Sequence, residues 1–228
     1  MPPPASTFDF DPIAERYDRW YDEPQGAIYD RLEKRAVARL LPDRGRGGEL
    51  LDVGCGTGHW ARFFAERGFR VTGIDISPSM VRLARAKAIS CTSFIVADAH
   101  RLPFPDRRFD VVVAITTLEF VRDAEVVVRE MARCVRRPGG ILLVGALNER
   151  AAINRQRKTA GKPTYRQARF FTPRGLRALL SPWGRADLAC VGFVPRRAVL
   201  LPLAPVAEAL GRALRLPWGA FIVGRVVL

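Results

Sequence analysis

The stretch Leu50-Leu51-Asp52-Val53-Gly54-Cys55-Gly56-Thr57-Gly58-His59-Trp60 is a short apolar run followed by three glycines at alternate positions. A buried strand that turns tightly into a helix needs such a sequence, because glycine adopts backbone angles closed to other residues and lets a ligand approach the backbone. A dinucleotide-binding turn has the spacing G-x-G-x-x-G, which would put its third glycine at His59. The spacing therefore disfavours a nicotinamide-dependent oxidoreductase and predicts a strand, a tight turn and a helix, with or without a ligand.

The composition is that of a soluble globular protein, since 48% of the 228 residues are hydrophobic and 26% are charged. A chain of this length can bury one large core and fold as one domain. The four cysteines are far apart and there are only two histidines, so we expect neither a disulfide framework nor a metal site. The cysteine pattern fits a reduced, cytoplasmic setting. The N-terminus has no signal-peptide pattern, and no apolar run is long enough to span a bilayer, so we expect a soluble protein.

Apolar runs alternate with helical stripes along most of the chain, as in a doubly wound α/β sheet. Strands are predicted at 49–53, 70–74, 93–97, 109–115, 141–146, 186–194 and 220–228. Helices are predicted at 60–67, from Pro78 onward, at 124–135, from Pro173 onward and around 206–214. Two short helices precede the first strand, and residues 150–169 show no strong period. We expect a mostly parallel, seven-stranded, Rossmann-like sheet with helices on both faces and a C-terminal antiparallel pair.

Acidic residues follow the next two strands. Asp75 ends the second strand, and Asp98 follows the third in the sequence Ala97-Asp98-Ala99, shortly before Leu102-Pro103-Phe104. A lone Asp at a strand end is usually a turn or cap residue. At this distance from the glycine turn, however, a carboxylate can accept hydrogen bonds from the hydroxyl groups of a ribose. The fourth strand ends in Thr116-Thr117-Leu118-Glu119-Phe120.

Together these motifs resemble those of the class I S-adenosylmethionine-dependent methyltransferases. The similarity runs from about Phe10 to Asn148 and points to the type 11 methyltransferase domain, as found in ubiquinone and menaquinone biosynthesis. Fainter matches occur at 171–173 and at 219–221. The resemblance implies that the chain binds S-adenosylmethionine and transfers its methyl group to an acceptor.

The same resemblance implies where the methionyl end of the cofactor lies. Gly54, Gly56 and Gly58, with Cys55 among them, would border its methionyl and ribose parts. Asp52 would lie near the ammonium group.

For the nucleoside end, the resemblance implies that Asp75 accepts from the ribose hydroxyls and that Ile76 presses against the adenine ring. Asp98 would accept from the adenine amino group, and the backbone N–H of Ala99 would reach a ring nitrogen. Thr116 would lie at the strand end that faces the methyl donor.

Two residues are candidates for catalysis. Glu119 could act as a general base or orient the acceptor, or it could be an exposed loop carboxylate. Tyr17 is predicted to share one face of the N-terminal helix with Trp20 and Tyr21. Aromatic rings attract cations such as a sulfonium, so Tyr17 and Tyr21 are predicted to cover the cofactor, unless this face simply packs onto the sheet. No D/N-P-P-Y/F sequence follows the fourth strand, which argues against methylation of a nucleic-acid base.

The positive charge is concentrated in one segment. Residues 150–186 carry ten basic and no acidic side chains, whereas residues 1–149 carry 22 basic and 21 acidic ones. This segment could be a solvated arginine-rich surface or a site for an anionic substrate or an anionic membrane surface. The neighbouring apolar stretch 199–203 supports the second of these alternatives, because basic and amphipathic segments attach to interfaces, and a lipid or quinone-like substrate would suit it. Nucleic acid is the third alternative, and no stripe of stacking aromatics supports it.

We therefore expect one methyltransferase domain, residues 1–228. It would comprise an N-terminal helical lid (1–45), a core that binds S-adenosylmethionine (46–148) and a basic, substrate-side segment (149–228). The expected acceptor is a small hydrophobic or anionic molecule, similar to a quinone, a lipid or another metabolite. The alternative is a catalytically silent protein, or an RNA-directed enzyme that uses the basic face. No motif identifies the acceptor or the oligomeric state.

Overall fold

The computed structural model describes residues 6–41, 47–160, 163–195 and 198–228. Residues 1–5 and 42–45 of the expected lid, and Lys162 of the basic segment, lie outside the described residues. The strands are β1 (Glu49–Val53), β2 (Arg70–Asp75), β3 (Thr92–Val96), β4 (Val111–Ile115), β5 (Ile141–Leu147), β6 (Asp187–Val191) and β7 (Phe221–Val227). The α-helices are α1 (Arg19–Asp22), α2 (Pro24–Leu40), α3 (His59–Glu66), α4 (Pro78–Ala86), α5 (Ala124–Cys134), α6 (Ala152–Thr159), α7 (Pro163–Arg166), α8 (Pro173–Leu180) and α9 (Ala204–Ala213). The 3-10 helices are η1 (Asp11–Arg16), η2 (Ser181–Trp183) and η3 (Ala198–Leu203).

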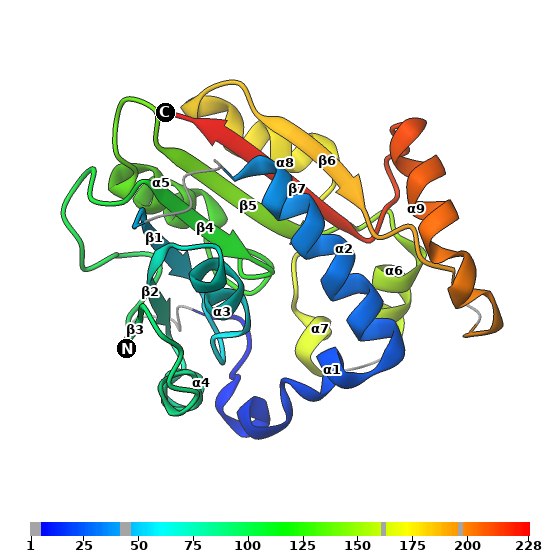
Figure 1. The fold of residues 1–228 in the computed structure, drawn as a ribbon, viewed down its shortest axis with the longest axis horizontal. Helices are drawn as coiled ribbons and strands as arrows, with labels where there is room; N and C mark the ends of the chain where they lie inside the picture. Colours follow the sequence, from blue (N-terminus) through cyan, green and yellow to red (C-terminus); the bar gives the residue numbers. More distant parts are fainter. Residues whose placement is uncertain (1–5, 42–46, 161–162, 196–197) are drawn as a thin grey trace.

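The strands form one seven-stranded sheet in the order β3-β2-β1-β4-β5-β7-β6 (Figure 1). The first five strands are parallel, with Leu51 of β1 opposite Thr72 of β2 and Val112 of β4. Strand β7 runs antiparallel to both β5 and β6 and lies between them. The predicted fold class is therefore confirmed, including the antiparallel strands at the C-terminal end.

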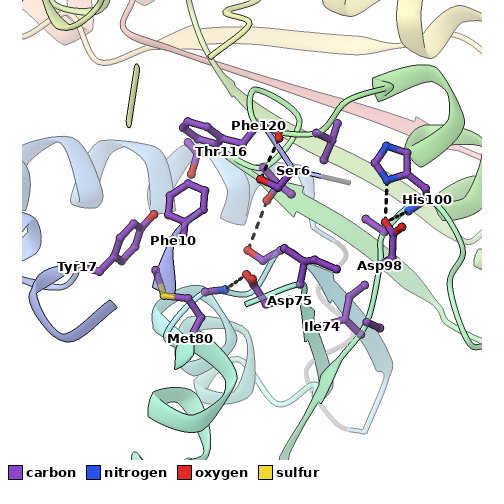
Figure 2. A pocket seen from close by; sticks show the side chains of 17 residues that line it. Ser6, Phe10, Tyr17, Ile74, Asp75, Met80, Asp98, His100, Thr116 and Phe120 are labelled. Atoms are coloured by element: carbon purple, nitrogen blue, oxygen red, sulfur yellow. Dashed lines mark hydrogen bonds and ion pairs between the residues drawn. The ribbon is translucent and has the colours of Figure 1, made fainter. Parts of the chain in front are cut away.

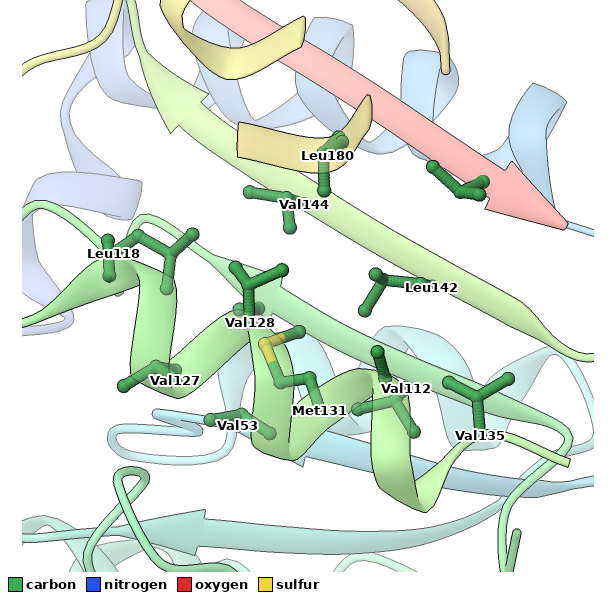
Figure 3. Packing of buried hydrophobic residues seen from close by; sticks show 14 of the residues in the cluster. Val53, Val112, Leu118, Val127, Val128, Met131, Val135, Leu142, Val144 and Leu180 are labelled. Carbon is green, nitrogen blue, oxygen red and sulfur yellow. The ribbon is translucent and has the colours of Figure 1, made fainter. Parts of the chain in front are cut away.

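Helices cover both faces of the sheet. Successive residues of a strand point to opposite faces. Every residue of β4 is buried, so both faces of the sheet must be covered at this strand. On one face Val112 packs with Val128 and Met131 of α5, and with Leu180 of α8 (Figure 3). On the other face, residues of α2 and α3 pack with neighbouring strand residues that include Val111, Val113 and Leu143. Helix α1 packs against α2, and α7 packs against α6 (Figure 1).

Two segments differ from the expectation. The N-terminal aromatic residues do not lie on one continuous helix, because η1 ends at Arg16 and α1 begins at Arg19. The basic segment contains α6 and α7, although its sequence has no strong helical period. Tertiary hydrogen bonds hold α6: the side chain of Asn154 donates to the carbonyl oxygens of Asn148 and Ala220, at 2.9 and 2.7 Å.

In the described part of the chain, no helix combines the length and the hydropathy that crossing a bilayer requires.

Candidate functional site

A pocket of about 620 Å³, partly open to solvent, lies where β1, β2, β3 and β4 end (Figure 2). In open α/β sheets, ligands bind in the crevice at the carboxyl ends of the strands. Eight of the residues predicted from the sequence line this pocket: Tyr17, Gly54, Gly56, Asp75, Ile76, Asp98, Ala99 and Thr116. The structure thus brings together residues from five separate segments of the sequence.

The glycine turn shapes the floor of the pocket. Gly54, Gly56 and Gly58 have φ angles of 73, 51 and 82°, a region that favours glycine. At Gly54 a Cβ atom would also lie 2.4 Å from the hydroxyl oxygen of Thr117, which donates to the carbonyl oxygen of Val53 at 3.0 Å. Gly54 is therefore required both by its backbone angle and by its neighbour at the end of β4.

Asp75 lies at the end of β2, with its carboxylate between two backbone N–H groups. Its Oδ2 accepts from Gly56 and its Oδ1 from Ser77, each at 2.9 Å. Burial raises the pKa of Asp75, and these hydrogen bonds oppose the rise. Each carboxylate oxygen can accept a second hydrogen bond, so a diol in the pocket could bind here. The apolar side chain of Ile76 beside it is 43% exposed, which leaves a surface for a flat ring.

The carboxylate of Asp98 is held in place by hydrogen bonds with His100. Its Oδ1 accepts from the backbone N–H of His100 at 2.8 Å and lies 2.7 Å from Nδ1 of the same residue. Nε2 of His100 lies 3.2 Å from the backbone nitrogen of Asp123. The pair lines the pocket on the side of β3 (Figure 2).

The N-terminal segment, residues 6–22, closes the pocket through polar contacts. Ser77 donates a hydrogen bond from its hydroxyl to Asp11, which also accepts from the backbone N–H of Ser79 at 3.1 Å. Asp18 accepts from the hydroxyl of Thr57 and pairs with Lys87, both at 2.6 Å. These acids fasten the segment to the start of α4, to the glycine turn and to the residue that follows α4.

One wall of the pocket is aromatic. The ring of Phe10 packs edge-on against those of Tyr17 and Phe120, with centroid distances of 6.2 and 5.1 Å. Burial raises the pKa of Tyr17 above its ordinary value, so its hydroxyl stays protonated at neutral pH.

The predicted aromatic face does not form as a unit. Trp20 stacks with Tyr29 at a centroid distance of 6.4 Å, and Tyr21 stacks on His59 at 3.6 Å. The expectation that Trp20 shares one face with Tyr17 is wrong, because Trp20 packs against α2 and does not line the pocket. Tyr21 lies outside the pocket lining, so its predicted contact with a cofactor stays a prediction.

Four other predicted residues are not among those that line the pocket. Gly58 caps α3, and the buried Cys55 lies beneath the turn, where a Cβ atom on Gly73 would be 2.9 Å from its sulfur. Asp52 is buried, its Oδ2 has no partner among the described residues, and burial raises its pKa to about 7.

Glu119 is also buried, so it is not an exposed loop carboxylate. Its Oε1 accepts from the backbone N–H of Leu147 at 2.5 Å, while its Oε2 has no partner in the described part of the chain. Burial raises the pKa of Glu119 to about 7. Its neighbour Phe120, not Glu119 itself, lines the pocket.

The remaining residues of the lining were not predicted as site residues: Ser6, Phe10, Ile74, Met80, Ala97, His100, Thr117, Phe120 and Val121. The sequence held a signal for His100, a histidine two residues after Asp98. It held none for Ser6 and Phe10, because only the folded chain brings them to β4. No group of three or more His, Cys, Asp or Glu side chains that could hold a metal ion is found in the parts of the chain that the structure describes.

No described residue of the basic segment, 150–186, lines this pocket. Two of its basic side chains make cation–π contacts. The guanidinium of Arg157 lies 4.8 Å from the ring centre of Trp20, and the ammonium nitrogen of Lys158 lies 5.7 Å from that of Phe170. Other members, such as Arg155 and Arg166, are exposed.

The comparisons with known proteins agree with this geometry. Residues 51–144 match the family described as "Methyltransferase domain". The phosphatidylethanolamine N-methyltransferase of Cereibacter sphaeroides is 36% identical over 143 residues, which are 60% of this chain and 68% of that protein. The uncharacterized protein MJ1123 of Methanocaldococcus jannaschii is 31% identical over 177 residues, 77% of this chain and 80% of its own. A crystal structure from Thermotoga maritima, described as an S-adenosylmethionine-dependent and possible histamine N-methyltransferase, superposes with a TM-score of 0.73. It is 26% identical, and the match covers 96% of this chain and 97% of that one.

Proposed function

The chain belongs to the S-adenosylmethionine-dependent methyltransferases, and from this premise we propose that it methylates a small acceptor with an apolar part. S-adenosylmethionine supplies an already activated methyl group. The protein therefore has to bind the two molecules in line and exclude water, which can provide most of the acceleration.

The residues present fit this cofactor. In our proposal Asp75 binds the ribose, Asp98 and Ala99 bind the adenine edge, and Ile76 covers the adenine face. The supporting observation is that these side chains meet in one pocket, above a glycine turn with an open backbone. Asp52 adds a second one, because its buried Oδ2 lacks a partner and would suit the ammonium group of the methionyl part.

The aromatic wall favours an acceptor with an apolar part. Phe10, Tyr17 and Phe120 line the pocket beside Thr116, whose φ of 49° is rare for a non-glycine residue. Backbone strain of this kind tends to be stored at functional sites. We propose that Tyr17 contacts the cofactor or the acceptor through its neutral hydroxyl and ring. The related phosphatidylethanolamine N-methyltransferase is named for a lipid acceptor, which is consistent with a lipid-like or quinone-like molecule.

Glu119 has a different role in this proposal from the one its position in the sequence suggests. Because its Oε1 holds the end of β5 next to the loop after β4, we propose that it is a positioning residue. Its carboxyl group keeps the two strand ends together behind the pocket wall.

The experiment that tests the function uses S-adenosylmethionine labelled in its methyl group. The protein and this donor are incubated in three separate reactions, which contain a lipid extract, a polar metabolite extract or total RNA. We expect label in the lipid or metabolite fraction, and none with Asp75→Ala. Label in RNA would contradict the proposed acceptor class. Binding of S-adenosylhomocysteine in calorimetry without any transfer would support the catalytically silent alternative.

A further inference from the structure

Helix α9 carries its acidic residue on the inside and its large apolar residues on the outside. Glu208 is only 7% exposed, and its Oε2 accepts from the backbone N–H groups of Gly192 and Phe193 at 2.9 and 3.0 Å. Ala204 and Gly211 are buried on the same side. This arrangement is the reverse of that expected for a helix on the surface of a soluble protein.

The orientation of α9 is fixed by close contact. A Cβ atom on Gly211 would lie 2.4 Å from the ring of Phe193, so only glycine lets the helix approach this ring. With Glu208 bound to two backbone N–H groups at the same face, α9 cannot rotate to bury its apolar side. The exposed apolar face is therefore a stable feature of the fold.

That face is a continuous apolar stripe. Leu203, Val206, Leu210 and Leu214 are 53, 58, 57 and 67% exposed, and they recur at intervals of three and four residues. Such spacing places them on one side of a helix. Trp218, 52% exposed, follows in the turn before β7. We call these five residues the α9 stripe.

An apolar hollow of about 650 Å³ adjoins the α9 stripe. Its lining includes Ala207 of α9, Trp218, Ile153 of α6, Val194 and Pro195. On a helical wheel Ala207 follows the stripe directly, so the stripe and the hollow form one apolar area. Figure 1 shows α9 at the outer edge of the molecule, beside α6 and beyond α2.

The part of the sequence that carries this area is strongly basic. Residues 150–228 contain fifteen basic and two acidic side chains, Asp187 and Glu208. Asp187 pairs with Arg225 at 3.0 Å, and Glu208 is buried. Exposed arginines occur on the same elements: Arg212 on α9, Arg215 in the turn after it and Arg155 on α6.

We propose that the α9 stripe and its basic surroundings attach the protein to the surface of an anionic lipid bilayer. Leucine and tryptophan enter the interface of a bilayer, while arginines bind its anionic head groups. A second copy of this chain fits less well, because the contact would bring two basic segments together. A nucleic acid would bind the arginines but would leave the exposed leucines of the α9 stripe in contact with water. The inference goes beyond methyl transfer and does not depend on it.

The test is sedimentation of the full chain with lipid vesicles. Vesicles of phosphatidylcholine that contain phosphatidylglycerol are compared with vesicles of phosphatidylcholine alone. We expect at least roughly tenfold tighter binding to the anionic vesicles, with a blue shift of tryptophan fluorescence that is absent in Trp218→Phe. The double variant Leu210→Ser and Leu214→Ser should lose most of this binding, and its thermal midpoint should stay unchanged because both side chains are exposed.

Val227→Ser is the matched control, since Val227 is 53% exposed and lies at the other end of β7. It should bind vesicles as the unaltered protein does. No binding to anionic vesicles, or equal loss in the control and the double variant, would overturn the proposal. A dimer in solution that dissociates in the double variant, without vesicle binding, would assign the α9 stripe to a second copy and also overturn it.

Discussion

The imidazole of His100 donates its Nδ1 hydrogen to Oδ1 of Asp98 across 2.7 Å. The direction of this bond follows from the other ring nitrogen, because Nε2 faces the backbone N–H of Asp123 and must accept from it. Asp123 in turn caps α5 by accepting from Glu125 and Val126. A chain of hydrogen bonds therefore runs from the start of α5 to the carboxylate that we propose binds adenine, and it leaves Oδ2 of Asp98 available to the ligand.

We predict that His100→Phe weakens the binding of S-adenosylhomocysteine by about tenfold, which corresponds to one lost hydrogen bond to a charged group. The variant should also bind the analogue with hypoxanthine in place of adenine almost as well as the natural ligand. Calorimetry with both ligands measures this discrimination. A variant that still rejects the hypoxanthine analogue would show that Asp98 needs no help from His100.

The binding of S-adenosylhomocysteine should depend on pH through Asp52. Burial raises the pKa of Asp52 to about 7, so this carboxyl is largely protonated at pH 6 in the free protein. The ammonium group of the ligand favours the ionised form, so binding must release a proton and should weaken as the pH falls below 7. Calorimetry in two buffers of different ionisation enthalpy detects this proton.

The same raised pKa has a consequence for stability. An acid whose pKa is higher in the folded than in the unfolded protein destabilises the fold as the pH rises from about 4 towards 7. Asp52→Asn should remove both this loss and the proton release on binding. A pH dependence that persists in Asp52→Asn would assign the proton to another group.

The contacts of Asp18 should control how fast the ligand leaves. Asp18 links the N-terminal segment to Thr57 and Lys87, next to Tyr17 in the pocket wall. We predict that Asp18→Ala speeds the dissociation of S-adenosylhomocysteine by roughly tenfold, because charge-assisted bonds of this kind contribute about 1.5–3 kcal/mol. Stopped-flow displacement measures the rate. Glu15→Ala is the control: its pair with Arg82 is exposed, so its removal should leave the rate within about twofold.

Glu119→Gln separates positioning from base catalysis. The amide oxygen of glutamine can still accept from Leu147, so we expect the turnover number to stay within a few-fold and its pH profile to keep its shape. Glu119→Ala should lose the thermal stability that this contact provides. A fall of about a hundredfold or more with Glu119→Gln, together with loss of a pH limb near 7, would instead identify a catalytic base.

Much of the fold could be predicted from the sequence, because local chemistry sets it. The glycine turn, the Ser77 cap with Pro78 and the fully apolar β4 are each determined by neighbouring residues. The predicted strand limits differ from the observed ones by a few residues at most. Helix α6 could not be predicted in the same way, since Asn154 holds it through contacts with residues far along the chain.

The same distinction between local and long-range determinants holds for the residues of the candidate site. Asp75, Asp98 and the glycines follow strands, so the sheet places them together. Phe10 and Ser6 reach the pocket from the N-terminal segment, and no local pattern shows where that segment lies. Trp20 packs against α2 and not on the pocket wall, because regular helical spacing does not continue across the turn between η1 and α1.

The position of β7 has a consequence for how the chain assembles. Strand β6 pairs with β7 and has no other partner in the described sheet, yet β7 follows it by some thirty residues and fits between it and β5 (Figure 1). As the polypeptide leaves the ribosome, the five parallel strands can pair and form the pocket at their ends. Strand β6 cannot join the sheet until β7 has been synthesised. The half of the protein that we propose binds the cofactor can thus take shape before the half that carries α9 is locked in place.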